Sequence, residues 1–184
     1  METRRVRGAR VLLPSDDEAP VTVWPFADLL EREKVGNTGF RDVDLSSHRW
    51  TGVTLNRCRF VGARLTGLAV SGASLSDVLF EDCTFDYAVL DGVRVTGDVA
   101  FVNCSFRESV FSGSDLGGAV FDGCALGAEF DTSRMRDADL RGSDLSGLSG
   151  LASLKGATVA EAQLRQLLDV MVGELRLTVA EADD

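Results

Sequence analysis

The sequence predicts a solenoid, a stack of short repeated units, and two observations lead to this prediction. Large apolar residues recur every five positions from Phe40 to Leu145, with one residue inserted after Val95 and one deleted after Leu126. Small or β-branched residues precede most of them by two positions. Neither the 3.6-residue period of a helix nor the two-residue period of a strand explains this spacing. Each unit therefore points one large and one small residue inward, and a turn leads to the next unit.

All 22 positions of the large series are apolar. They are Phe40, Leu45, Trp50, Leu55, Phe60, Leu65, Val70, Leu75, Phe80, Phe85, Leu90, Val95, Phe101, Phe106, Phe111, Leu116, Phe121, Leu126, Phe130, Met135, Leu140 and Leu145. Glycine often follows the large residue by two positions, as at Gly52 and Gly62, where a tight corner favours a residue without Cβ.

Four segments, ARLTG (63–67), AVLDG (88–92), ADLRG (138–142) and SDLSG (143–147), resemble units of the pentapeptide-repeat family. The resemblance implies an all-β solenoid, a right-handed quadrilateral parallel β-helix with four units per coil. Residues 38–147 then make about five to six coils, each rising by the strand spacing of about 4.8 Å. Placing four units on each coil stacks Phe40, Phe60, Phe80, Phe101 and Phe121 in one core column.

The two ends of the chain lack the repeat and are expected to cap the open ends of the solenoid. In the N-terminal segment, residues 1–37, we expect short strands at 11–13 and 21–24, a weak helix at 28–34, and Trp24 and Phe26 over the first coil. In the C-terminal cap, residues 148–184, residues 158–161 read as a capping box, followed by a helix that stops near Gly173. A short strand at 174–179 and an acidic tail follow.

The predicted C-terminal helix carries an apolar stripe at helical spacing, which serves either as the cap or as the seam of a homodimer. Its members are Leu164, Leu167, Leu168 and Met171, with Leu175 beyond them.

Composition excludes several classes of function. The net charge is −10 and the pI is near 4.6, so direct binding to nucleic acid is not expected. No apolar run approaches the length of a membrane helix, and the charged N-terminus lacks the apolar region of a secretory signal. The 4 Cys are expected to be free thiols in a reducing compartment, which favours the cytoplasm.

No arrangement of residues indicates catalysis, a metal or a cofactor. The single His48 sits at an inward position and is expected to be a packed side chain. The Cys residues have no CxxC pair, and three of them, Cys83, Cys104 and Cys124, fall on the small inward position of successive coils. The protein is therefore expected not to be an enzyme.

Surface charge is segregated along the repeat. Residues 38–76 carry a net +3, whereas residues 77–131 carry −9. The candidate partner-binding residues of the acidic stretch are Asp77, Glu81, Asp82, Asp86, Asp91, Glu108, Asp115, Asp122, Glu129 and Asp131. Carboxylates on a rigid rod are suited to a basic groove on a protein partner, because they bind without ordering a flexible chain.

The family resemblance implies a specific partner, since some members resemble B-form DNA in width and charge and protect DNA gyrase from quinolones or natural toxins. The alternative is a structural or protein–protein interaction scaffold. Outward apolar residues also need a cover, which is the N-terminal segment, a partner or a second copy. These residues are Val61, Leu79, Ala100, Val102 and Val120.

Overall fold

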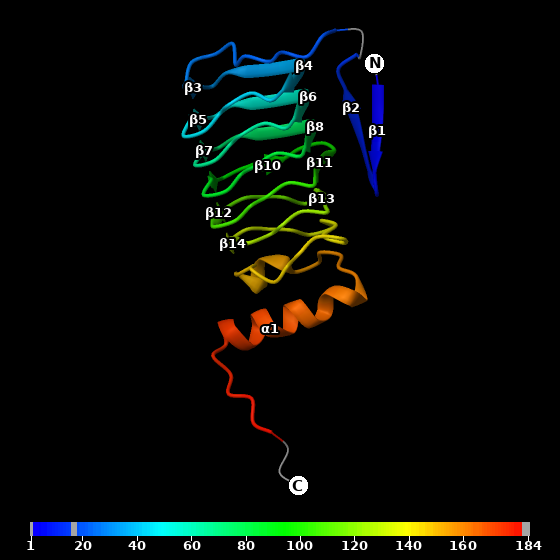
Figure 1. Ribbon diagram of the computed structural model, residues 1–184, viewed down its shortest axis with the longest axis vertical. Coiled ribbons are helices and arrows are strands. Elements are labelled where there is room, and N and C mark those ends of the chain that lie inside the picture. Colours follow the sequence, from blue (N-terminus) through cyan, green and yellow to red (C-terminus); the bar gives the residue numbers. More distant parts are fainter. Residues whose placement is uncertain (1, 16–17, 182–184) are drawn as a thin grey trace.

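The computed structural model describes residues 2–15 and 18–181, which form a parallel β-solenoid of about five coils and one short C-terminal helix (Figure 1). The strands are β1 Glu2–Val6, β2 Ala9–Leu13, β3 Leu29–Glu31, β4 Lys34–Arg41, β5 Arg49–Thr51, β6 Thr54–Val61, β7 Ala69–Ser71, β8 Ser74–Glu81, β9 Val89–Asp91, β10 Arg94–Val95, β11 Val99–Val102, β12 Ser109–Ser112, β13 Val120–Asp122 and β14 Ala128–Asp131. Two 3₁₀ turns, Leu151–Leu154 and Glu161–Gln163, precede helix α1, Leu164–Glu174.

Parallel pairing connects each coil to the next on four sides, which confirms the expected four-sided tube. The strands β4, β6 and β8 pair along their whole length and turn one corner, so each contributes to two sides. A second sheet, in the order β14-β12-β9-β7-β5-β3, makes the third side. Single bridges that run from Asp44 through Arg64 and Thr84 down to Asp144 make the fourth.

The aromatic column predicted from the five-residue period fills the tube. The ring centroids of Phe40 and Phe60 are 4.8 Å apart, those of Phe60 and Phe80 are 4.9 Å apart, and the pairs Phe80–Phe101 and Phe101–Phe121 follow at 5.1 and 4.8 Å. All five side chains are buried. The separation matches the strand spacing, so backbone pairing and ring stacking reinforce each other.

Both interruptions of the period fall at corners. Leu75 pairs with Val95 but Val78 pairs with Val99, so one additional residue is accommodated in the corner between β10 and β11. The one-residue deletion in the five-residue period also falls at a corner, the one between Ala125 and Ala128. Pairing resumes in register after each, and the inward column is therefore uninterrupted.

Left-handed backbone at the corners explains the recurrent glycine. Gly62 has φ +65°, and a Cβ there would overlap the Asp42 carboxylate. Asp42 and Asp82 occupy the same corner in the coils on either side of Gly62, with φ of 54° and 53°. Gly147 differs from the other expected corner glycines, because its φ is outside the left-handed region.

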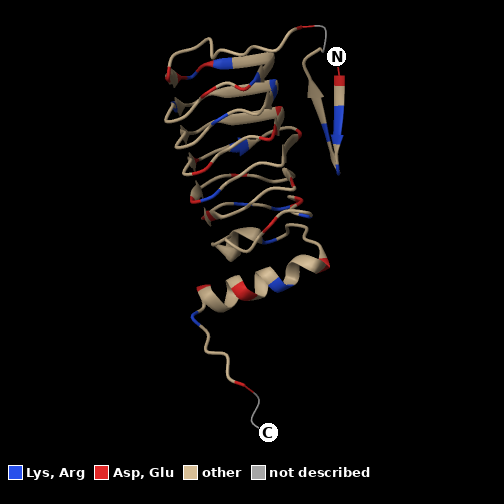
Figure 2. Ribbon diagram, in the orientation of Figure 1, with Lys and Arg blue, Asp and Glu red and all other residues tan. Residues whose placement is uncertain are grey.

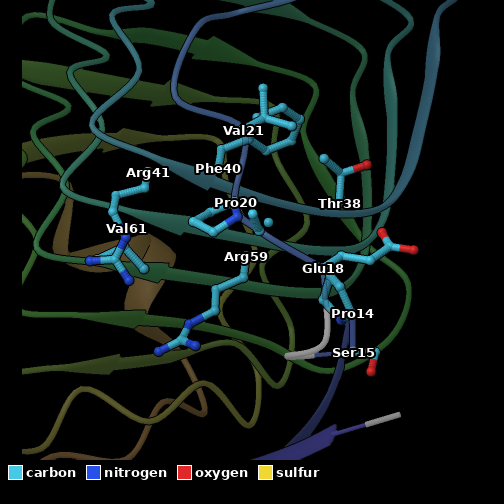
Figure 3. A pocket seen from close by; sticks show the side chains of 12 residues that line it. Pro14, Ser15, Glu18, Pro20, Val21, Thr38, Phe40, Arg41, Arg59 and Val61 are labelled. Atoms are coloured by element: carbon cyan, nitrogen blue, oxygen red, sulfur yellow. The ribbon is translucent and has the colours of Figure 1, made fainter.

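A feature that the sequence analysis missed is an antiparallel hairpin of β1 and β2, which lies along one side of the stack (Figure 1). Basic residues mark this hairpin in Figure 2. Its inward side chains pack on Leu79, Ala100 and Val120 and bury them, with Val102 partly buried beside them. Of the three alternatives, the N-terminal segment is therefore the cover for these three outward apolar residues, because the hairpin belongs to that segment. Val61 instead lines a cavity of about 270 Å³ with the segment that follows the hairpin (Figure 3).

Residues 18–41 differ from the expected N-terminal cap. The helix predicted at 28–34 is wrong: β3 occupies that region and pairs with β5, because Leu30 belongs to the buried column of the first coil. The stack therefore begins at Leu29, ahead of the expected boundary at residue 38. Within 21–24 only Val21 makes a bridge, to Phe40, so the strand expected there is also wrong.

Trp24 lies across the open end of the first coil. Its ring centroid is 5.1 Å from that of Phe40 and 5.6 Å from that of Trp50, on which it stacks. Phe26 packs against Trp24 with centroids 5.1 Å apart. Both aromatic residues contact the core cluster.

The C-terminal cap begins later than predicted. Thr158 bridges to Asp139 as part of the last coil and opens no helix. Instead, the buried Gln163 accepts a hydrogen bond from the Ala160 N–H at 2.7 Å and donates to the carbonyl oxygens of Leu140 and Ser143, at 2.8 and 2.7 Å. One glutamine thereby satisfies backbone groups that the end of the solenoid leaves free.

Helix α1 ends at Glu174, one residue after Gly173, which confirms the predicted end of the helix. Residues 175–181 form no strand, because no neighbouring strand is available for pairing and the side chains of Leu175, Leu177 and Val179 are exposed. Among the described residues, no helix has both the length and the apolar character required to cross a membrane.

Candidate protein-binding surface

The ten candidate acidic residues fall into two sets that differ in exposure. Half of them, Asp77, Glu81, Asp86, Asp115 and Asp122, are partly buried and have partners within the chain. The other half are exposed and form what we call the exposed carboxylate surface, Asp82, Asp91, Glu108, Glu129 and Asp131. Charge alone did not separate these sets, because the distinction comes from which side each residue occupies.

The hairpin uses three of the partly buried acids. Arg7 approaches Asp122 with its Nη2 at 2.8 Å and its Nε at 3.2 Å from Oδ1. The Leu12 N–H donates to Asp77 Oδ1 at 3.0 Å. Glu81 lies 3.5 Å from Arg4 and accepts from Arg59 at 2.8 Å. These three carboxylates therefore fix the hairpin to the solenoid and are not available to a partner while it is in place.

The other two partly buried acids order the coil itself. Asp86 accepts hydrogen bonds from the Ser105 hydroxyl and from the Arg107 N–H, the latter at 3.0 Å. Asp115 accepts from the Gly117 N–H at 3.2 Å and lies 3.6 Å from Arg134. Such bonds to corner amides hold the turns of successive coils in position.

Three members of the exposed carboxylate surface lie on the sheet that contains β9, β12 and β14. Ser112 is paired with Asp91 on one side and Asp131 on the other, and it donates its hydroxyl to Asp91 at 2.9 Å. Glu129 is paired with Val110, next to Val89, which is 48% exposed. Carboxylates and partly exposed apolar side chains thus share one rigid side, with Glu129 one strand spacing from Val110 and Asp91 two strand spacings from Asp131.

The remaining two members lie at corners. Asp82 follows β8, and Glu108 precedes β12. Both have left-handed backbone, with φ of 53° and 52°, which turns their side chains away from the tube. Glu108 consequently extends the exposed carboxylate surface around one edge of the flat side, whereas Asp82 lies at the corner between the side that the hairpin covers and the side of the Thr84 bridge.

Family comparison agrees with this repeated geometry: a model described as pentapeptide repeats matches 8 copies, at residues 40–77 and 99–127. This chain is a pentapeptide-repeat protein. A search of curated protein sequences returned no match to it.

Solved structures similar to this pentapeptide-repeat protein include HetL from the cyanobacterium Nostoc sp. strain PCC 7120, involved in heterocyst differentiation regulation, at 13% identity and TM-score 0.32. That alignment covers 62% of this chain and 63% of HetL, slightly less than two thirds. Full-length QnrB1, a plasmid-mediated fluoroquinolone resistance protein, aligns at 14% identity and TM-score 0.31 over 82% of this chain and 98% of its own. Rfr23 from the cyanobacterium Cyanothece 51142 aligns at 11% identity and TM-score 0.28, over 73% and 88%.

The inward side of the pentapeptide-repeat protein leaves no room for a substrate. The void inside the tube measures about 30 Å³, which is the share of a single water molecule in the liquid. Within residues 2–15 and 18–181, no group of three His, Cys, Asp or Glu side chains is arranged to hold a metal ion. His48 is buried beside Trp24, with ring centroids 6.4 Å apart.

All four cysteines are buried free thiols. Burial raises the pKa of Cys58 to about 11. Burial, together with hydrogen bonds to the neighbouring thiols, raises the pKa of Cys104 well above its usual value, whereas the hydrogen bond with Cys104 lowers that of Cys124. Cys104 contacts a thiol in the coil on either side, so these residues fill the small inward positions as the five-residue pattern predicted.

The C-terminal helix presents its predicted apolar stripe only partly to the solenoid. Leu167 packs against the core, and Met171 is partly buried. Leu164 and Leu168 are 53% and 46% exposed, whereas Val170, which was not singled out, is buried. The contact face of α1 is therefore rotated from the predicted one.

Proposed function

We propose that this pentapeptide-repeat protein is a non-enzymatic binding protein that presents the exposed carboxylate surface to a basic groove of a cytoplasmic protein partner. The observation that carries the proposal is the exposure of five carboxylates on a scaffold held by parallel pairing on four sides. The small void in the tube supports binding over catalysis.

We propose DNA gyrase, or another type II topoisomerase, as the partner, with protection from quinolones or natural toxins as the outcome. Carboxylates on a rigid rod occupy phosphate positions in a basic groove without a further loss of conformational freedom. The DNA mimic proposed here differs from a uniformly acidic rod, because the hairpin carries Arg4, Arg5, Arg7 and Arg10 along one side. The partner must therefore contact the sides away from the hairpin.

The direct test is gyrase supercoiling with and without ciprofloxacin, titrated with the protein. Asp91→Lys, Glu129→Lys and Asp131→Lys together should abolish protection, because the exposed side changes sign. The matched control is Glu18→Lys, Glu33→Lys and Glu161→Lys, which changes the net charge equally at exposed residues elsewhere. If the unaltered protein gave no protection at tens of micromolar, gyrase would be rejected as the partner. If both triple variants lost protection equally, the exposed carboxylate surface would be rejected as the binding site.

An interaction scaffold with another protein partner is the second candidate. The side that carries Asp91, Glu129 and Asp131 also exposes Val89, and this mixture suits a protein surface better than a nucleic-acid site. Affinity capture with the unaltered protein and with the same triple lysine variant distinguishes the two. A single captured partner that is not a topoisomerase, lost in the variant, supports the scaffold.

We also propose that the C-terminal segment forms a homodimer seam. Leu164 and Leu168 on α1 are exposed, and Leu175 beyond it is 62% exposed. Leu164→Glu with Leu168→Glu should shift sedimentation from dimer to monomer. Val23→Glu, at a residue that is 77% exposed at the opposite end, is the control. A monomer in the unaltered protein at tens of micromolar rejects the seam.

A further inference from the structure

The hairpin of β1 and β2 lies against the solenoid without being built into it. It forms a two-stranded sheet of its own, and within residues 2–15 and 18–181 no backbone–backbone hydrogen bond joins it to a solenoid strand. It is connected to the rest of the chain only at the end of the stack where β4 lies (Figure 1). The solenoid is paired on four sides without it. The hairpin therefore has the contacts of a bound peptide.

The apolar contact beneath the hairpin is separate from the core of the tube. Leu79, Ala100 and Val120 are the outward residues of three successive coils, paired in register, and we call them the covered strip. The hairpin side chains that pack on this strip are Val6, Ala9, Val11 and Leu13. This cluster shares no residue with the main core. Detachment of the hairpin would thus expose the covered strip and leave the aromatic column in place.

Carboxylates border the covered strip on both edges. At one edge, Asp77 accepts a hydrogen bond from a backbone N–H of β2 at 3.0 Å. At the other edge, Glu81 lies 3.5 Å from Arg4, and Asp122 lies 2.8 Å from Arg7. An apolar strip between two rows of carboxylates matches an extended segment in which apolar residues alternate with arginine. The hairpin has that pattern, so its contacts identify the chemistry that this side binds.

The outward face of the hairpin opposes the stability of the hairpin itself. Arg5 and Arg10 lie directly opposite each other on the two strands, and both are exposed. Neither has an ion pair within the part of the chain that the structure describes. Like charges at opposed positions repel, and an isolated two-stranded hairpin is marginally stable in water. A partner segment without this repulsion can therefore compete for the covered strip.

We infer that the side of the solenoid beneath the hairpin is a second protein-binding site. Its ligand is an extended segment of a protein partner in which apolar residues alternate with arginine, and the hairpin is the intramolecular competitor for the site. The inference is independent of the proposed topoisomerase. It uses a different side of the solenoid from the one that carries Asp91, Glu129 and Asp131, and it requires no basic groove.

The probe is a fluorescein-labelled peptide with the sequence of residues 2–13, titrated with the full chain and followed by fluorescence anisotropy. Arg4→Glu with Arg7→Glu should release the hairpin, because the new carboxylates repel Glu81 and Asp122. Probe binding should then become about tenfold tighter, since a tethered competitor acts at a high effective concentration. The matched control is Arg5→Glu with Arg10→Glu, which changes the net charge equally on the outward face and should bind the probe like the unaltered protein.

The site is tested in the released variant. Adding Asp77→Asn with Asp122→Asn should weaken probe binding by about tenfold, and a peptide of the same composition in scrambled order should not saturate. Equal binding of the scrambled peptide, equal affinity of the released and control variants, or no saturation of the released variant would overturn the inference. A dimer of the unaltered protein that Arg4→Glu with Arg7→Glu dissociates would also overturn it, because the occupant would then be a second copy.

Hydrogen exchange measures the detachment of the hairpin directly. In the released variant the amides of β1 and β2 should exchange faster, whereas those of β6 and β8 should exchange as in the unaltered protein, which establishes that the solenoid is folded. In the unaltered protein the hairpin amides should exchange faster than those of β6 and β8. One common rate for all four strands would show that the hairpin does not detach separately, and this result would overturn the inference without any variant.

Discussion

Phe101 is the most informative position at which to perturb the core, because it touches rings in both directions along the column. Its centroid lies 5.1 Å from Phe80 with 4° between planes and 4.8 Å from Phe121 with 12°. Two further rings, Phe85 and Phe106, meet it edge-on at 5.8 and 5.4 Å. The side chain is 3% exposed.

Replacing Phe101 by Ala should lower the free energy of unfolding by about 5 kcal/mol, the upper part of the range for buried phenylalanine. The upper part is expected because paired strands above and below prevent the cavity from collapsing, and because four ring contacts are lost. The loss should appear as a lower midpoint in urea, followed by circular dichroism.

Tyr87→Ala is the control, since Tyr87 is the aromatic side chain exposed at a corner, 63% accessible, and its removal should cost less than about 0.5 kcal/mol. A loss below about 1.5 kcal/mol for Phe101→Ala, with an unchanged slope against urea, would refute the continuous column. A changed slope would instead mean that the solenoid separates into two unfolding units.

Three further predictions concern the hairpin, the thiols and acid stability. Arg7→Glu should accelerate hydrogen exchange of the β1 amides by repelling Asp122, and the double variant with Asp122→Arg should slow it again; equal rates in all three would show that the ion pair does not hold the hairpin. Iodoacetamide at pH 8 should leave the native thiols unmodified and label them in urea, because all four are buried and burial also raises the pKa of Cys58 to about 11. The pKa of Asp139 is lowered mainly by its hydrogen bond from Arg141, so its contribution to stability is complete above the ordinary carboxyl value and is lost as pH falls through the lowered one. Urea midpoints between pH 2.5 and 6 should therefore fall less steeply on acidification for Asp139→Asn than for the unaltered protein.

The repeat was predictable from sequence because each coil depends on residues of a recurrent type at a recurrent spacing. Phe101 and Phe121 remained in the column after the inserted residue because a corner tolerates a change in length that a paired side does not. The first coil was harder to recognise, since β3 has only three residues and its register comes from pairing with β5. Local preference over so short a segment contains little information.

The hairpin had a signal that sequence reasoning did not use. Ala9, Val11 and Leu13 alternate with Arg10 and Leu12, and Arg7–Gly8 is a two-residue connection between paired strands. Arg7 has φ 49°, as such connections require. The strand expected at 11–13 covers only the second half of this pattern, because Arg4 and Arg7 interrupt the apolar alternation in the first half.

The acidic candidates were predictable only as a set. Nothing in the spacing indicates that Asp77 accepts a hydrogen bond from a backbone amide of the hairpin, or that Asp122 forms an ion pair with an arginine of the hairpin. Their partners are more than sixty residues away in sequence. Tertiary contacts therefore decide which carboxylates are free.

The direction of the hairpin has a mechanical consequence. In a solenoid each coil touches only its two neighbours, so separation can start at either end and proceed one rung at a time. Strand β2 packs against β6, β8 and β11 together, and Arg7 reaches Asp122 in the coil after them. The hairpin therefore ties several coils together. No one of these coils can unfold before the whole hairpin detaches, so the middle of the solenoid should unfold cooperatively.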